Sequence, residues 1–143
     1  MTGINRQIVR DRAREIREAA QKVQQYAALP DEAFFADERN LYTVEHLLLI
    51  AIEAAAALCN HVLAKTARRA PTSYVECFEG LQAVHKLNEG LAAKLVQMAR
   101  FRNLLVHRYR GVDAARVPEY ARNNMGDFEA YLQAIGEIVG QPV

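Results

Sequence analysis

The residues best able to do chemistry lie close together in the last third of the chain, where polar side chains interrupt an apolar stretch. Four of them share one broad face if residues 91–109 form one helix, because each residue turns a helix by about 100°; they are Arg102, Asn103, His107 and Tyr109. A histidine can move a proton near neutral pH. An arginine can bind two oxygens of a phosphate group together. The spacing therefore predicts a site on one side of this helix.

The rest of the chain shows the apolar spacing of helices. The predicted segments are residues 5–28, a short piece that starts with Asp31 as its N-cap, residues 41–67, a helix from a cap at Thr72 or Ser73 to about 84, a helix from Asn88 through the polar residues, and a last helix from near Asp113 or Pro118 to near Gly140. No strand-like alternation appears. We therefore predict one all-α domain over residues 1–143, an up-and-down bundle of four to five helices.

The stretch over residues 41–67 is apolar on most sides. A helix of this kind is either central or at an oligomer interface, and its alanines allow neighbouring helices to approach closely. Its apolar surface exceeds what one small bundle normally covers. We therefore predict a homodimer.

The composition excludes several other classes of protein. With 18 basic and 17 acidic residues, the chain has no global positive field, so any nucleic-acid contact must be local. No Gly-rich phosphate loop occurs. The N-terminus is too charged for a signal peptide, and no segment is expected to span a bilayer, which predicts a cytoplasmic protein without membrane contact.

Neither the cysteines nor the other histidines predict a metal site. Cys59 and Cys77 fall inside predicted helices without a paired spacing, which favours buried, reduced thiols. His46 and His61 are too far apart on one helix to share a metal ion, and His85 has no partner at ligand spacing. We therefore expect no metal and no cofactor bound to this chain.

The four polar residues also resemble a known motif. Asn103 follows Arg102 directly, His107 comes five residues after the arginine, and Tyr109 comes two residues later. This spacing resembles the motif of HEPN-domain proteins, and of their HepT toxin branch in particular. Ala51 to Ala55, Asn60-His61, Pro71 to Tyr74 and Phe101 to Asn103 fall in the order and spacing of that branch. Two positions depart from it: Ala57 stands where many relatives carry Asp, and His46 follows Glu45 where Arg is common.

The resemblance implies an all-helical, dimeric, metal-independent endoribonuclease toxin, encoded beside a minimal nucleotidyltransferase antitoxin. His107 would then act as general base or acid, and Arg102 would stabilise the charge on the phosphorane, with Asn103 in support. Because one histidine cannot easily serve both proton transfers, a twofold dimer would supply two copies of each residue. The surrounding RNA contacts would be Arg100, Arg108 and Arg110.

The resemblance also implies how the toxin is controlled. Tyr109 would accept AMP from the partner nucleotidyltransferase, which uses ATP and Mg²⁺; this chain uses neither. The added phosphate would occupy the arginines and repel RNA, which would silence the toxin.

Each of these residues also has a simpler structural interpretation. His107 near a helix end can serve as a C-terminal cap, Arg102 can form a structural ion pair with Glu53, and Tyr109 can be a rim residue with its hydroxyl in water. Two other functions follow from such interpretations. The chain would be either a non-catalytic module that binds a nucleotidyltransferase or a nucleotide, an alternative favoured by Ala57, or a structural helical adaptor.

Overall fold

Every regular element of the protein is an α-helix in the computed structural model, which describes residues 3–107 and 113–143. In chain order the helices are α1 (Arg6–Ala27), α2 (Asp31–Ala36), α3 (Glu38–Ala67), α4 (Tyr74–His85), α5 (Glu89–Val106), α6 (Arg116–Asn123) and α7 (Met125–Val139). The prediction of an all-α fold is confirmed.

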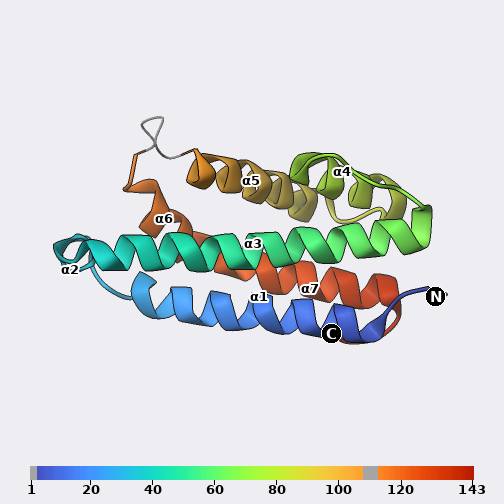
Figure 1. Cartoon of the computed structure of the whole chain (residues 1–143), viewed down its shortest axis with the longest axis horizontal. Helices are drawn as coiled ribbons and strands as arrows, with labels where there is room; N and C mark the ends of the chain where they lie inside the picture. Colours follow the sequence, from blue (N-terminus) through green and yellow to red (C-terminus); the bar gives the residue numbers. More distant parts are fainter. Residues whose placement is uncertain (1–2, 108–112) are drawn as a thin grey trace.

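The central helix is α3, which runs the length of the molecule between α1 and α7 on one side and α4 and α5 on the other (Figure 1). It packs against α1, α2, α4, α5 and α6. Its apolar side chains are therefore buried on several faces, among them Leu48, Ile52 and Leu58. Because Ala51 and residues 54–56 carry no bulk beyond Cβ, neighbouring helices can approach α3 closely. This helix is the frame against which α5 is held.

Local signals set most helix boundaries. Asn5 caps α1, Ser73 caps α4 and Asn88 caps α5, each with a side-chain oxygen that accepts backbone N–H groups of the first turn. Ser73, one of the two expected candidates, is thus the cap of α4. Gly140 ends α7 at φ 81°, a left-handed conformation that glycine adopts without a Cβ clash.

The structure corrects three details of the predicted bundle. Seven helices occur in the described residues, where four to five were predicted. One of the two additional helices is α2, which was predicted as a short piece and not counted as a helix of the bundle. Its N-cap is Pro30, without a side-chain hydrogen bond, so Asp31 lies in the first turn and is not the N-cap. The second additional helix arises because the predicted last helix is divided into α6 and α7. They are separated at Asn124, whose φ of −121° and ψ of 1° are not helical.

The third correction concerns the end of α5. The helix ends at Val106, short of residue 109, and His107 is its C-cap, with φ −103° and ψ 25°. The backbone N–H of His107 still donates to the carbonyl oxygen of Asn103 one turn earlier, so His107 follows the last turn of α5 as its cap. Arg108, Tyr109 and Arg110 lie outside the described residues.

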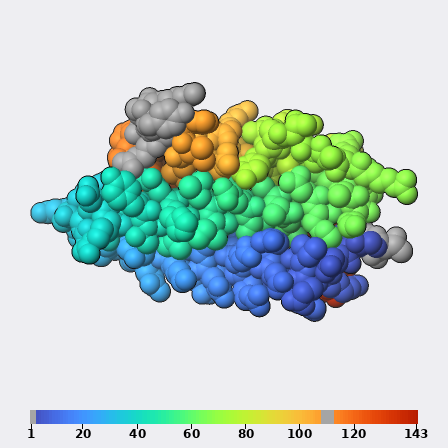
Figure 2. Space-filling model, in the orientation of Figure 1, coloured from blue at the N-terminus to red at the C-terminus, as the bar shows by residue number. Residues whose placement is uncertain are grey.

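Contrary to the sequence prediction, α3 is long and apolar enough to cross a membrane by length and composition. However, 56% of its most apolar window is buried inside the molecule, as expected for a core helix. One side of α3 remains at the surface, as a continuous turquoise to green band between α1 and the helices α4 and α5 (Figure 2).

Candidate functional site

Arg102 lies in the last turns of α5 and is held by side chains from two other helices. Its guanidinium carbon is 4.5 Å from the centroid of the Tyr74 ring of α4. Its Nη2 is 3.8 Å from Glu53 Oε1 of α3. Tyr74 thus fixes the plane of the guanidinium by a cation–π contact, and Glu53 attracts its charge. Arg102 is placed by α3 and α4 as much as by its own helix.

The charge of Arg102 is only weakly compensated. The Arg102 side chain is 26% exposed and that of Glu53 is 51% exposed, so water screens a pair whose atoms are already 3.8 Å apart. In addition, Arg102 Nε is enclosed and has no hydrogen-bond acceptor among the described residues. A buried donor without an acceptor is costly. Arg102 therefore offers both charge and an unused donor to an anionic ligand.

Asn103 and His107 lie next to Arg102 at the end of α5. The side chain of Asn103 is exposed, and its Oδ1 accepts a long hydrogen bond of 3.4 Å from Arg102 Nη1. The backbone N–H of His107 donates to the carbonyl oxygen of Asn103 at 3.1 Å, and His107 is half-buried. The structure thus brings together three of the predicted site residues. Their catalytic roles stay predictions.

The two structural interpretations given for these residues are also present in the fold. His107 does cap α5, through its backbone N–H. Arg102 does pair with Glu53. Neither contact excludes catalysis, because the cap uses no imidazole atom and Arg102 Nε has no acceptor within residues 3–107 and 113–143.

Arg100 does not join this cluster. It is exposed and lies two residues before Arg102, which places it about 200° away around the helix axis. There it lines a pocket between α5 and α6. The predicted RNA contacts Arg108 and Arg110 and the predicted AMP acceptor Tyr109 lie outside the described residues.

Sequence reasoning gave Tyr74 no role, although its ring orients Arg102. The sequence spacing of Tyr74 and Arg102 does not predict their contact, because that contact depends on how α4 packs against α5. Glu53 was named only as a structural partner of Arg102. The direct signal for Glu53 was that it is the one charged residue in the apolar stretch of residues 47–59.

The other histidines have structural partners. His61 Nε2 accepts a hydrogen bond from the backbone N–H of Asn5 at 3.0 Å, and burial lowers the pKa of His61, with a smaller effect from Lys65. His85 Nε2 lies 2.9 Å from Thr66 Oγ1, and burial lowers its pKa too. Within residues 3–107 and 113–143, no group of three or more His, Cys, Asp and Glu residues could hold a metal ion.

The cysteines are free and buried, as predicted. Cys59 Sγ donates to the carbonyl oxygen of Cys77 at 3.2 Å, and Cys77 Sγ donates to Asn60 Oδ1 at 3.4 Å. The hydrogen bond with Cys77 and burial raise the pKa of Cys59, which keeps that thiol protonated and unreactive.

Comparison with known proteins agrees with this helical frame. The family model described as Ribonuclease HepT-like matches residues 16–135, which include α3, α4 and α5. The chain therefore belongs to the HepT-like ribonuclease family. No curated protein matches the sequence.

Solved structures share the fold over nearly the whole chain. The tri-AMPylated HEPN toxin of Shewanella oneidensis, in complex with MNT antitoxin, is 22% identical with a TM-score of 0.82, and the match covers 91% of this chain and 97% of that one. A toxin–antitoxin structure with AMP-PNP is 22% identical at TM-score 0.79, covering 90% and 97%. YutE of Bacillus subtilis, a cytosolic protein of unknown function, is 16% identical at TM-score 0.75, covering 100% and 98%. At these identities the likeness shows that the chain has the HEPN toxin fold.

Proposed function

We propose that this chain is the toxin of a HEPN toxin–MNT antitoxin module and cleaves RNA without a metal ion, in the cytoplasm. The observation that carries the proposal is Arg102: its guanidinium is oriented by Tyr74 and Glu53, yet its enclosed Nε has no acceptor among the described residues. A phosphate oxygen would satisfy that donor. Membership of the HepT-like ribonuclease family supports RNA as the source of the phosphate.

In the proposed reaction, His107 removes the proton from a ribose 2′-hydroxyl and the 2′-oxygen attacks the adjacent phosphorus. The bond from phosphorus to the 5′-oxygen breaks, and a second histidine protonates that oxygen, which leaves a 2′,3′-cyclic phosphate and a 5′-hydroxyl. Arg102 stabilises the negative charge that develops on the non-bridging oxygens. Asn103, which already contacts Arg102, helps to fix the orientation of the guanidinium.

The second histidine comes from a second copy of the chain. The exposed side of α3 supports this dimer, since Tyr42, Leu49 and Glu53 lie within about 40° of one another around the helix. Tyr42 is 53% exposed there, and Val106 at the end of α5 is 39% exposed. Burial of this surface against its twofold copy would bring two Arg102 sites toward one another.

The partner in this proposal is a minimal nucleotidyltransferase that transfers AMP from ATP to the hydroxyl of Tyr109. Support comes from the resemblance at residues 102–109 and from similar structures that pair such a toxin with MNT antitoxin, one with the toxin tri-AMPylated. The transferred phosphate would add negative charge two residues beyond His107.

The test of the proposed function is RNA cleavage in EDTA by the wild type, His107→Ala and the control His85→Asn, which changes a histidine outside the site. Loss of a proton-transfer group typically lowers the rate by about 10²–10⁴-fold, so His107→Ala should be nearly inactive while His85→Asn stays active. Full activity in His107→Ala, or loss of wild-type activity in EDTA, would contradict the proposal. Circular dichroism checks that both variants remain helical.

A further inference from the structure

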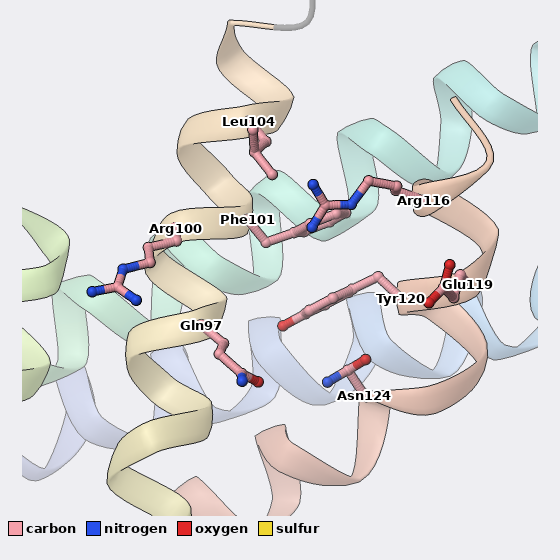
Figure 3. Close-up of a pocket in the computed structure, with 8 residues that line it drawn as sticks. All are labelled: Gln97, Arg100, Phe101, Leu104, Arg116, Glu119, Tyr120 and Asn124. Carbon is pink, nitrogen blue, oxygen red and sulfur yellow. The ribbon is translucent and has the colours of Figure 1, made fainter. Parts of the chain in front are cut away.

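A pocket of about 360 Å³ opens between α5 and α6 (Figure 3). Its α5 residues lie on the side of that helix opposite Arg102, by the turn of about 100° per residue. Ligand pockets in proteins typically measure about 300–1,000 Å³. Half of its lining residues come from each helix: Gln97, Arg100, Phe101 and Leu104 from α5, and Arg116, Glu119, Tyr120 and Asn124 from α6 and its C-cap.

One wall of the pocket is a rigid aromatic pair. The rings of Phe101 and Tyr120 are stacked, with centroids 4.0 Å apart and planes within 6° of parallel. Phe101 is 4% exposed and Tyr120 is 9% exposed, so both rings are anchored in the core. The pocket therefore has a fixed apolar side against which a flat ligand can pack.

Among the residues that the structure describes, the hydroxyl of Tyr120 has no hydrogen-bond partner, although the atom is buried. Figure 3 shows Tyr120 extending from α6 toward α5, with its oxygen toward Gln97 and with Asn124 nearby. Burial raises the pKa of Tyr120, and the charge of Asp127 raises it further, so the hydroxyl remains a donor. Leaving such a donor unpaired is costly. A ligand atom that displaces the Gln97 side chain would give it an acceptor.

The pocket also carries excess positive charge. Neither Arg100 nor Arg116 forms an ion pair with any described residue, and both are exposed. Glu119 supplies the single carboxylate of the lining. In Figure 3 the Arg116 side chain extends from α6 toward α5, whereas the Arg100 guanidinium points away from the other lining side chains. The uncompensated guanidinium of Arg116, beside polar amides, is suited to a ligand that has a phosphate at one end and hydrogen-bonding edges at the other.

We propose that this pocket binds a ribonucleoside monophosphate unit, with Arg116 on the phosphate and Gln97 and Asn124 on the edge of the base. Side-chain amides pair well with base edges. The Tyr120 hydroxyl donates to the base, and the Glu119 carboxylate accepts from a ribose hydroxyl. The unit is either a free nucleotide or one nucleotide of an RNA strand; in the second case the inference rests on the proposed ribonuclease function.

Calorimetric titration of the whole chain tests the pocket. The probes are AMP, GMP, CMP and UMP, inorganic phosphate, and a five-nucleotide RNA with intact 2′-hydroxyls, which is titrated into His107→Ala so that the proposed cleavage does not occur. Arg116→Gln should weaken nucleotide binding by about 10- to 100-fold, and Tyr120→Phe by about 2- to 10-fold. Tyr120→Phe keeps the stacked ring and removes only the unpaired oxygen, so it should fold at least as stably as the wild type. Arg6→Gln, at an exposed position in the first turn of α1, should bind like the wild type.

A nucleoside monophosphate whose binding depends on Arg116 and Tyr120 establishes the pocket with a free nucleotide as its ligand. The same dependence seen only with the RNA establishes it as part of a strand-binding surface. Binding of inorganic phosphate as tight as that of all four nucleotides overturns the proposal, as does binding unchanged in both variants or absent for every probe. Cleavage of unmodified RNA is measured separately. Nucleotide binding without cleavage would overturn the proposed function alone, and cleavage with unchanged binding would overturn the pocket alone.

Discussion

Replacing Arg102 with alanine should remove activity while leaving stability nearly unchanged. The cation–π contact with Tyr74 stabilises the fold by about 0.5–1 kcal/mol. The ion pair with Glu53, at 3.8 Å and half-exposed, adds roughly 0–1 kcal/mol. Against this, the buried Nε without an acceptor costs about 1–3 kcal/mol. These contributions oppose one another, so the free energy of unfolding of Arg102→Ala should lie within about 1 kcal/mol of the wild-type value.

The effect on cleavage should be far larger. Removing a group that stabilises charge in the transition state typically lowers the rate by about 10²–10³-fold. Cleavage of a fluorophore–quencher RNA in EDTA measures this loss, and urea denaturation followed by circular dichroism measures stability.

Arg122→Ala is the matched control. Arg122 donates to the carbonyl oxygens of Leu29 at 2.9 Å and Ala27 at 3.3 Å and pairs with Asp31, so its guanidinium ties α6 to the link between α1 and α2. Its loss should reduce stability by about 1–3 kcal/mol and leave the cleavage rate of the folded protein near that of the wild type. The reasoning fails if Arg102→Ala keeps full activity, or if it loses more stability than Arg122→Ala, because Arg102 would then be a structural ion-pair residue.

Four further outcomes follow. Sedimentation at micromolar concentration should show a dimer, and a monomer alone would remove the shared site. Incubation with the cognate nucleotidyltransferase, ATP and Mg²⁺ should add AMP to the wild type but not to Tyr109→Phe, as intact-mass spectrometry reads directly; AMP on another residue would refute the assignment. Burial lowers the pKa of His61 below 6.5, so the folded state favours the neutral ring, which accepts a hydrogen bond from Asn5. The free energy of unfolding should therefore fall as the pH drops below 6.5. Thermal melting measured against pH should show a smaller fall in His61→Gln. Tyr131→Phe removes a buried hydrogen bond of 2.7 Å to the carbonyl oxygen of Ala55 and should lower the free energy of unfolding by about 1–2 kcal/mol in urea, whereas an unchanged value would mean that water replaces the hydroxyl.

The helices could be predicted from the sequence because their signals are local. Capping by Asn5, Ser73 and Asn88 depends on residues within the first turn. The stripe of buried residues in α1, such as Val9, Ile16 and Val23, follows the helical repeat directly. The type and order of the long helices therefore needed no knowledge of their packing.

The errors occurred where packing decides the backbone. The break at Asn124 separates α6 from α7, and Pro118, a plausible helix start, lies instead inside the first turn of α6, buried against the core. Proline is tolerated there because first-turn N–H groups have no partner within the helix. Nothing in the apolar spacing marks such a break, since both helices bury a continuous series of side chains.

The arginines of α5 show why the site itself could be predicted only in part. Arg100 and Arg102 are two residues apart, and the sequence grouped both as positive charge near one phosphate path. Their positions on the helix separate them: Arg102 contacts Tyr74 and Glu53, and Arg100 lies on the side of α5 that borders the pocket beside α6. A nearly neutral chain therefore has local positive charge on two opposite sides of one helix. An RNA strand that met both sides would have to cross α5, so substitutions at Arg102 and Arg116 should weaken RNA binding additively, as distant sites without shared partners do.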